Sequence, residues 1–175
     1  MERTLTRVRL IEERDQASPS QLDVFDHIAA SRGGRMIRPY AAMLHRPELA
    51  RAAADLGAVI RFQSSLSDHH RELAIVTTAV ERACEFEWNS HRPLAVEAGV
   101  AVATLAAVEE RGPVPDPGDA MIVEFVRALC HSDSDDDGIG DEMKARFGEE
   151  GFVELSVLVG YYSMMGVFMK ACDAC

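Results

Sequence analysis

The near absence of strand signals is the feature that most limits what this chain of 175 residues can fold into. No stretch shows a sustained alternation of apolar and polar residues bounded by turn residues, which is the pattern of a half-buried strand. Apolar residues instead recur three or four positions apart, as on one face of a helix; Leu49, Ala53, Leu56 and Ile60 are an example. The sequence therefore predicts an all-α protein.

Residues that begin or end helices divide this pattern into segments. Ser20 and Ser67 are expected to cap helices, and Pro39 and Pro47 suit the first turn of one. Gly148 is expected to end a short helix. The expected helices are 21–32, a segment from 39, 48–62, a long helix after 67, 102–110, 119–130, 142–147 and a last one from 152 to the tail.

Length and composition favour one domain. A chain of 175 residues matches one typical domain, and a hydrophobic fraction of 47% is enough to build a core. No linker is long enough to separate two domains. We expect an N-terminal extension over 1–18, the domain over 19–170 and a tail over 171–175.

The charge of the chain argues against two classes of partner. The formal net charge is -11, whereas nucleic acids and anionic membranes are bound by Lys and Arg. The sequence shows no run of about 18 apolar residues that would span a membrane, and no signal peptide. We therefore expect a cytoplasmic protein whose four cysteines are reduced.

Five residues between positions 81 and 91 form the candidate site. If this stretch is one helix, Glu81, Cys84, Glu87, Trp88 and His91 fall within an arc of roughly 120°. Glu87 and His91 are one turn apart and close enough to share a proton. The group therefore has the chemistry for acid–base work, and the thiol has the chemistry for redox work.

A structural interpretation of the same residues stays open. Charged residues at this spacing are commonly a solvated helix face, and a lone Cys is commonly a small buried hydrophobe. The mixture of Cys84 and Trp88 with charges suits a cleft better than open water. His91 also stands two residues before Pro93, near the expected end of the helix, where the dipole favours an imidazolium.

The chain resembles the carboxymuconolactone decarboxylase family of the alkylhydroperoxidase D-like superfamily. The resemblance extends from about 24 to 166 and is carried by 31–34, 45–50, 71–75, 84–91, 95–100, 153–155 and 160–162. It implies an all-α bundle that forms a homo-oligomer, a trimer or hexamer, with active sites near subunit contacts. Where the true decarboxylases carry Tyr-Cys-Gly-Val-Pro, this chain has Gly160-Tyr161-Tyr162, so the resemblance does not fix the substrate.

The resemblance implies different roles in the two branches of that superfamily. Glu81, Cys84 and His91 match the motif of the peroxidase branch, but Glu87 replaces its second cysteine, so the usual disulfide within the motif cannot form. The decarboxylase branch needs acids and a histidine here, which Glu87 and His91 supply.

The leading hypothesis is a carboxymuconolactone decarboxylase-like lyase that acts on a small carboxylated or lactone substrate. His91 would be the general acid or base, Glu87 would orient it, Glu81 would assist, and no cofactor or metal would be needed. The alternatives are a thiol-dependent peroxidase using Cys84 and a non-catalytic helical oligomeric binding protein.

Two further motifs carry weaker signals. Cys172 and Cys175 form a CxxC that suits a redox pair, half of a metal site, or a thiol that resolves an oxidised Cys84. The stretch 133–138 copies the first half of an EF-hand loop, but Lys144 stands where the loop needs its bidentate acid. An acidic surface loop is the expected outcome there.

Overall fold

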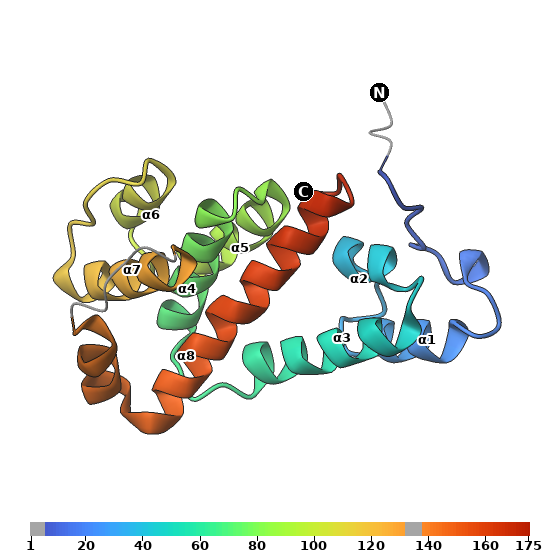
Figure 1. Ribbon diagram of the computed structural model, residues 1–175, viewed down its shortest axis with the longest axis horizontal. Helices are drawn as coiled ribbons and strands as arrows, with labels where there is room; N and C mark the ends of the chain where they lie inside the picture. The colour runs from blue at the N-terminus through green and yellow to red at the C-terminus, as the bar shows by residue number, and fades with distance from the viewer. Residues whose placement is uncertain (1–5, 132–137) are drawn as a thin grey trace. The chain divides into compact units, whose positions relative to one another are not determined.

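A computed structural model describes residues 6–131 and 138–175 of the chain. The described residues form one short 3-10 helix and eight α-helices, and no strand (Figure 1). The elements are η1(Arg14–Gln16), α1(Leu22–Ala30), α2(Arg38–Met43), α3(Pro47–Phe62), α4(Asp68–Glu81), α5(Glu85–Glu97), α6(Val102–Glu109), α7(Pro117–Cys130) and α8(Ile139–Ala171). The expectation of an all-α protein is confirmed over this part of the chain.

The expected helix starts have mixed outcomes. Ser67 caps α4, because its hydroxyl accepts a hydrogen bond from the His70 backbone N–H at 3.3 Å. Pro47 is the first residue of α3, as expected. The expected cap at Ser20 is wrong: Gln21 is the N-cap of α1 and makes no side-chain cap hydrogen bond.

The contacts divide the described chain into two compact units. One unit contains the chain up to residue 63 together with 168–174, and the other contains 64–167 together with Cys175. The boundaries expected at 18/19 and 170/171 stay predictions.

The first unit is built from α1, α2 and α3. Ile11, Ile28 and Leu44 are fully buried in it. The Ile11 N–H donates to the Ala41 carbonyl at 3.1 Å, which fastens the segment before η1 to α2. Arg7 donates to the Cys172 carbonyl at 2.9 Å, so the start of the described chain is also tied to residues that follow α8.

The second unit is organised around α4, which packs on α5, α6 and α7. Every residue from Glu72 to Ala79 is buried. The hydroxyls of Thr77 and Thr78 donate to carbonyls one turn earlier at 2.8 Å, so these polar groups are satisfied inside the helix. A helix buried on all sides is a core helix, and Glu72 is the charged residue within its buried stretch.

The long helix α8 changes direction at Gly148. This glycine has φ 70 and ψ -177 inside the helix, a backbone conformation that residues with a side chain rarely adopt. The expected end of a helix at Gly148 is therefore confirmed as a kink. By length and composition alone α8 could cross a membrane, but 44% of its most apolar window is buried, and core helices of soluble proteins pass the same test.

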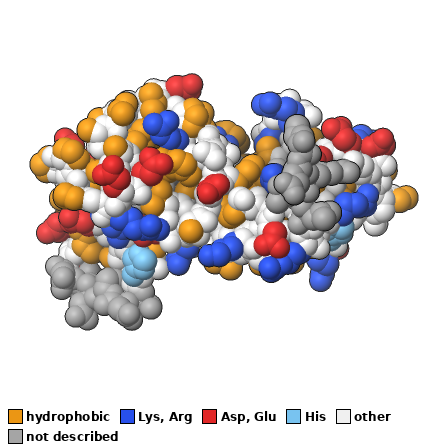
Figure 2. All heavy atoms as spheres, turned by 90° about the horizontal axis from the view of Figure 1, so that it is seen from above, with side chains coloured by type: hydrophobic (Ala, Val, Ile, Leu, Met, Phe, Trp, Pro, Cys, Tyr) orange, Lys and Arg blue, Asp and Glu red, His pale blue; other side chains and the backbone are white. Residues whose placement is uncertain are grey.

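Hydrophobic side chains also reach the surface, as the face drawn in Figure 2 shows. On α8 these are Val153, Val157, Met164 and Val167, which are 57%, 42%, 45% and 62% exposed. They recur at intervals of three, four or seven residues, so they lie along one stripe of the helix. Gly160 lies in the same stripe, and in the described part of the chain no atom outside the adjoining helix backbone lies within 4 Å of where its Cβ would be.

Candidate functional site

The backbone between α4 and α5 breaks the expected single helix over 81–91. α4 ends at Glu81, Ala83 has φ 50, and Cys84 is the extended N-cap of α5. The Cys84 N–H donates to the Ala79 carbonyl at 2.9 Å and the Ala83 N–H to the Val80 carbonyl at 3.1 Å. These bonds satisfy the last carbonyls of α4 as a left-handed C-terminal cap does. The expectation of one continuous helix is therefore wrong, and Glu81 does not share a helix with Cys84, Glu87 and His91.

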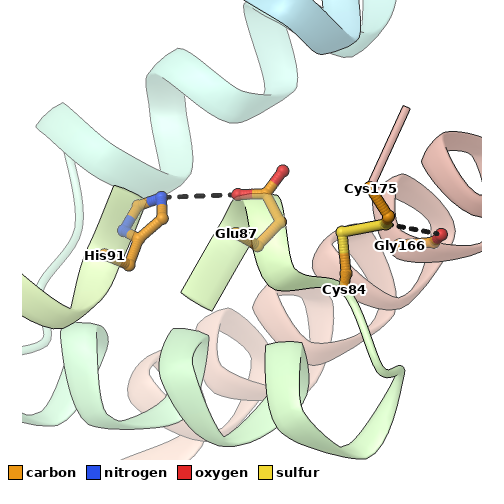
Figure 3. Close-up of a disulfide and its surroundings, with 5 residues drawn as sticks. All are labelled: Cys84, Glu87, His91, Gly166 and Cys175. Atoms are coloured by element: carbon orange, nitrogen blue, oxygen red, sulfur yellow. Dashed lines mark hydrogen bonds and ion pairs between the residues drawn. A yellow bond between two sulfur atoms is a disulfide. The ribbon is translucent and has the colours of Figure 1, made fainter. Parts of the chain in front are cut away.

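The pair predicted from spacing is present on α5. His91 Nε2 lies 3.6 Å from Glu87 Oε2, and each residue is 5% exposed (Figure 3). The expected position of His91 near a helix end is wrong, because α5 continues to Glu97 and contains Pro93. The helix tolerates Pro93 at the cost of one backbone hydrogen bond. The dipole at a helix C-terminus therefore does not act on this imidazole.

Glu72 is the closest partner of His91, and the sequence analysis did not identify it. Its Oε2 lies 2.7 Å from His91 Nδ1, and Glu72 is 3% exposed. Tyr162 of α8 lies on the other side, with its Oη 3.4 Å from Nε2. The available signal was an acid directly before the apolar run 73–76 of a core helix, since a buried acid needs a partner.

This geometry determines what the imidazole can do. With Glu72 accepting from Nδ1–H, the other nitrogen Nε2 is free to hold or accept a proton. Glu87 and Tyr162 border Nε2. The Nε of Arg71 lies 3.6 Å from Glu72 Oε1 and partly offsets the charge of that carboxylate. The arrangement has the geometry that acid–base chemistry requires, an imidazole with one orienting carboxylate.

Glu81 is held by a separate set of partners. His131 Nε2, Arg111 Nε and Arg127 Nε lie 3.0, 3.3 and 3.4 Å from its carboxylate, whose side chain is 2% exposed. Burial opposes ionisation, but hydrogen bonds from His131 and Arg111 and the charges of Arg111 and Arg127 outweigh it and lower the pKa of Glu81. These contacts make Glu81 a structural ion-pair residue and do not support the expected assisting role.

Cys84 forms a disulfide with Cys175, and their Cα atoms are 5.1 Å apart (Figure 3). The expectation of reduced thiols is therefore wrong at these two positions, while Cys130 and Cys172 are free. Cys172 and Cys175 do not bond to each other, so the CxxC is not a disulfide pair.

A cavity of about 330 Å³ opens beside Cys84. Its lining residues are Ala79, Val80, Ala83, Cys84, Glu85, Trp88, Glu109 and Arg111. Cys84 and Trp88 of the expected face thus share a cavity, whereas His91 and Glu87 are not among its lining residues.

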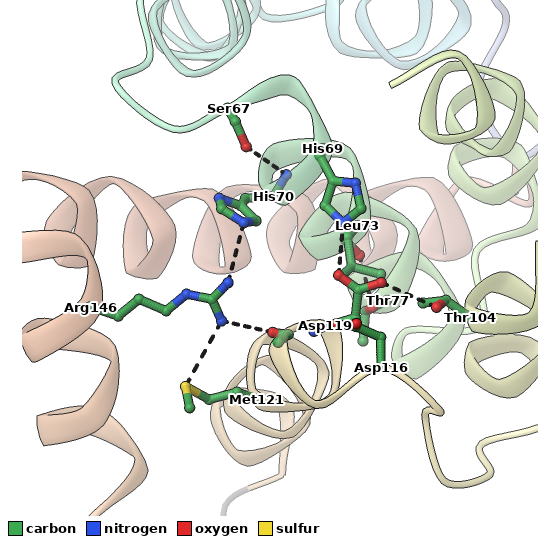
Figure 4. A network of polar contacts seen from close by, with 11 residues as sticks. Ser67, His69, His70, Leu73, Thr77, Thr104, Asp116, Asp119, Met121 and Arg146 are labelled. Carbon is green, nitrogen blue, oxygen red and sulfur yellow. Dashed lines mark hydrogen bonds and ion pairs between the residues drawn. The ribbon is translucent and has the colours of Figure 1, made fainter. Parts of the chain in front are cut away.

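The two histidines at the start of α4 belong to a different polar network (Figure 4). His69 Nε2 lies 2.7 Å from Asp119 Oδ1, and the Thr104 hydroxyl donates to Asp119 Oδ2 at 3.1 Å. His70 lies 3.4 Å from Arg146, and the pKa of His70 is lowered by burial and by that charge. This network ties α4 to α6, α7 and α8.

Within 6–131 and 138–175, no group of three His, Cys, Asp or Glu residues is arranged to hold a metal ion. The EF-hand-like stretch falls on 133–138, of which only Gly138 lies within the described residues.

Comparison with known proteins finds a family match for part of the chain. Residues 47–116 match the carboxymuconolactone decarboxylase family, and no curated protein matches the chain. The matched range runs from the start of α3 past the end of α6 and contains Glu72, Cys84, Glu87 and His91, while Tyr162 and Cys175 lie outside it. The similarity of this chain to the carboxymuconolactone decarboxylase family therefore lies in residues 47–116.

Proposed function

We propose that this chain is a carboxymuconolactone decarboxylase-like enzyme that performs acid–base chemistry on a small carboxylated or lactone substrate. The observation that supports this most is the buried contact of Glu72, His91 and Glu87 within the family segment. Three ionisable groups are seldom buried together without a role, since each loses its hydration. We also propose that it acts in the cytoplasm as a homo-oligomer.

The proposed reaction uses His91 as the proton donor. When the bond between carbon and CO2 breaks, its electron pair is delocalised through the unsaturated lactone as an enolate, and a proton from His91 Nε2 then bonds to the carbon α to the lactone carbonyl. Glu72 holds the Nδ1–H so that Nε2 faces away from it. A positioned acid or base of this kind contributes typically about 10² to 10⁴-fold to the rate.

Glu87 has a defined part in the same scheme. It lies one turn before His91 and borders Nε2. A carboxylated substrate at Nε2 would bring a second negative charge close to Glu87, and Glu87 is near enough to exchange a proton with His91. Glu87 would then return a proton to His91 after each turnover.

The reaction is tested with 4-carboxymuconolactone and related carboxylated lactones in D2O. We expect CO2 release and a product with one deuteron at the carbon α to the lactone carbonyl, both followed by NMR. Absence of CO2 release from all of these lactones would refute decarboxylation. Release without a preferred stereochemistry of the deuteron would indicate protonation by solvent and refute the role of His91.

The second candidate is a thiol-dependent peroxidase using Cys84. The specific observation in its favour is the disulfide between Cys84 and Cys175, which lies outside the motif. Glu87, which stands at the position of the second motif cysteine, cannot form such a bond. Hydroperoxide consumption that disappears in Cys84→Ser would establish this activity. Lactone turnover that persists in the same variant would show that the two activities are separate.

A further inference from the structure

We propose that Cys175 is the resolving thiol of Cys84 in the reduction of small uncharged organic hydroperoxides, which reach Cys84 through the cavity bordered by Trp88. This inference rests on the second candidate function and identifies its second thiol and its substrate class. The disulfide between Cys84 and Cys175 is the oxidised state of that site.

Gly166 of α8 makes room for this pair. A Cβ at position 166 would lie 3.0 Å from the Cβ of Arg82 and 3.6 Å from that of Cys84. Cys175 Sγ lies 3.8 Å from the Gly166 carbonyl oxygen. Once the disulfide is reduced, the Cys175 thiol can donate to this carbonyl, which would keep it beside Cys84 between turnovers.

Cys84 differs from the two free cysteines in its surroundings. It is the N-cap of α5, where the positive end of the helix dipole stabilises a thiolate, and it lines the cavity. Burial raises the pKa of Cys130 and of Cys172, so both remain protonated and react slowly. Peroxide is therefore directed to Cys84.

The cavity lining argues for an uncharged substrate. Ala79, Val80, Ala83 and Trp88 provide apolar walls. Arg111 also lines the cavity, but its guanidinium is engaged by Glu81 at 3.3 Å and by the Val80 carbonyl at 2.6 Å.

Glu85 and Glu109 also line this cavity. Their charges would repel an anionic hydroperoxide. Among the described residues that line the cavity only Arg111 is a cation, and its guanidinium is bound to Glu81 and to the Val80 carbonyl. A neutral alkyl or aryl hydroperoxide fits this lining.

The reaction balances with two substrates. The Cys84 thiolate attacks the terminal oxygen of the hydroperoxide, the O–O bond breaks, and the alkoxide takes a proton from water and leaves as an alcohol. The Cys175 thiol then attacks the sulfenic acid sulfur, so the S–S bond forms and water leaves. An external dithiol reduces the disulfide and becomes a disulfide itself.

The experiment uses reduced, desalted full-length protein and one equivalent of cumene hydroperoxide, with mass spectrometry and dimedone to trap sulfenic acid. Wild type should form the Cys84–Cys175 disulfide and little dimedone adduct. Cys175→Ser should accumulate the adduct on Cys84, at least about 10-fold above wild type. Cys172→Ser is the matched control from the same CxxC and should behave as wild type.

Three results would overturn the inference in different ways. If Cys84→Ser consumes peroxide as fast as wild type, the second candidate function fails and the inference fails with it. If Cys84 is oxidised but Cys175→Ser gives no more adduct than wild type, or Cys172→Ser gives as much, Cys175 is not the resolving thiol. If a carboxylated cumene hydroperoxide reacts as fast as the parent compound, the substrate class is wrong; we expect it to react about 10-fold more slowly.

Discussion

The imidazole of His91 has a different neighbour at each nitrogen. Glu72 holds Nδ1, while Glu87 and Tyr162 border Nε2. Spacing along the chain predicted the contact with Glu87, because residues four apart on a helix are neighbours. Spacing could not predict Glu72, which is 19 positions earlier on α4 and meets His91 only through the packing of α4 on α5.

The ion pairs of Glu81 lead to a prediction about stability and pH. The pKa of Glu81 is lower in the folded state than in the unfolded state. The contribution of Glu81 to the free energy of unfolding is therefore fully present above its unfolded pKa, about 4.3 for Glu, and is lost as the pH falls through its folded-state pKa. Glu81→Gln should lower the free energy of unfolding by about 2 kcal/mol at pH 7, since it removes the carboxylate that faces the charges of Arg127 and Arg111.

Urea denaturation at pH 7 and at lower pH checks this prediction. The difference between Glu81→Gln and wild type should shrink below about pH 4, the range in which Glu81 takes up its proton. Glu48→Gln is the control, because the Arg46–Glu48 pair is exposed and should change stability by less than about 0.5 kcal/mol. A Glu81→Gln effect that stays constant with pH would contradict the assignment.

At the scale of the elements, the break between α4 and α5 decides which residues share a face. The sequence 82–84 contains no glycine, which is the usual residue at a left-handed helix end, so the break gave no recognisable signal. Gly148, by contrast, was predicted as a break and is one. Pro47 and Gly148 marked helix boundaries that the structure has, whereas Pro93 lies inside α5 and Ala83 adopts the left-handed conformation without a signal in the sequence.

Ala83 gives a prediction of its own. Its φ of 50 disfavours a residue with a Cβ, so Ala83→Gly should raise the free energy of unfolding by about 0.5–1 kcal/mol. Ala106→Gly, at an exposed position within α6, should instead lower it by about 1 kcal/mol. Urea denaturation of both variants checks that their free energies of unfolding change in opposite directions. Destabilisation by Ala83→Gly would contradict the account of this turn.

At the scale of the whole molecule, the sequence predicted the helical class and a resemblance to the carboxymuconolactone decarboxylase family over about 24–166, of which the family match covers 47–116. Periodicity gives the class, and local motifs give the family. The division of contacts into two units could not be predicted in this way. It depends on packing between distant segments, such as residues 168–174 with the N-terminal helices, and no composition change marks it.

The exposed stripe of α8 supports the proposed homo-oligomer. Val153, Val157, Met164 and Val167 would be buried if α8 packed on a second copy, and Gly160 would allow close approach. We predict that wild type is an oligomer and that Val157→Glu with Met164→Glu shifts it to a smaller species, measured by light scattering after gel filtration. Leu129→Glu, at an exposed apolar position on α7, is the control; a monomeric wild type would refute the prediction.

The most direct test of the proposed acid–base centre compares two histidine variants in CO2 release from a carboxylated lactone that wild type turns over. His91 and His69 each lie 2.7 Å from a buried carboxylate, but only His91 belongs to the proposed centre. The account predicts that His91→Gln lowers kcat by at least about 100-fold while His69→Gln stays within about threefold of wild type, both folded by circular dichroism. Equal activity of His91→Gln and wild type would contradict it.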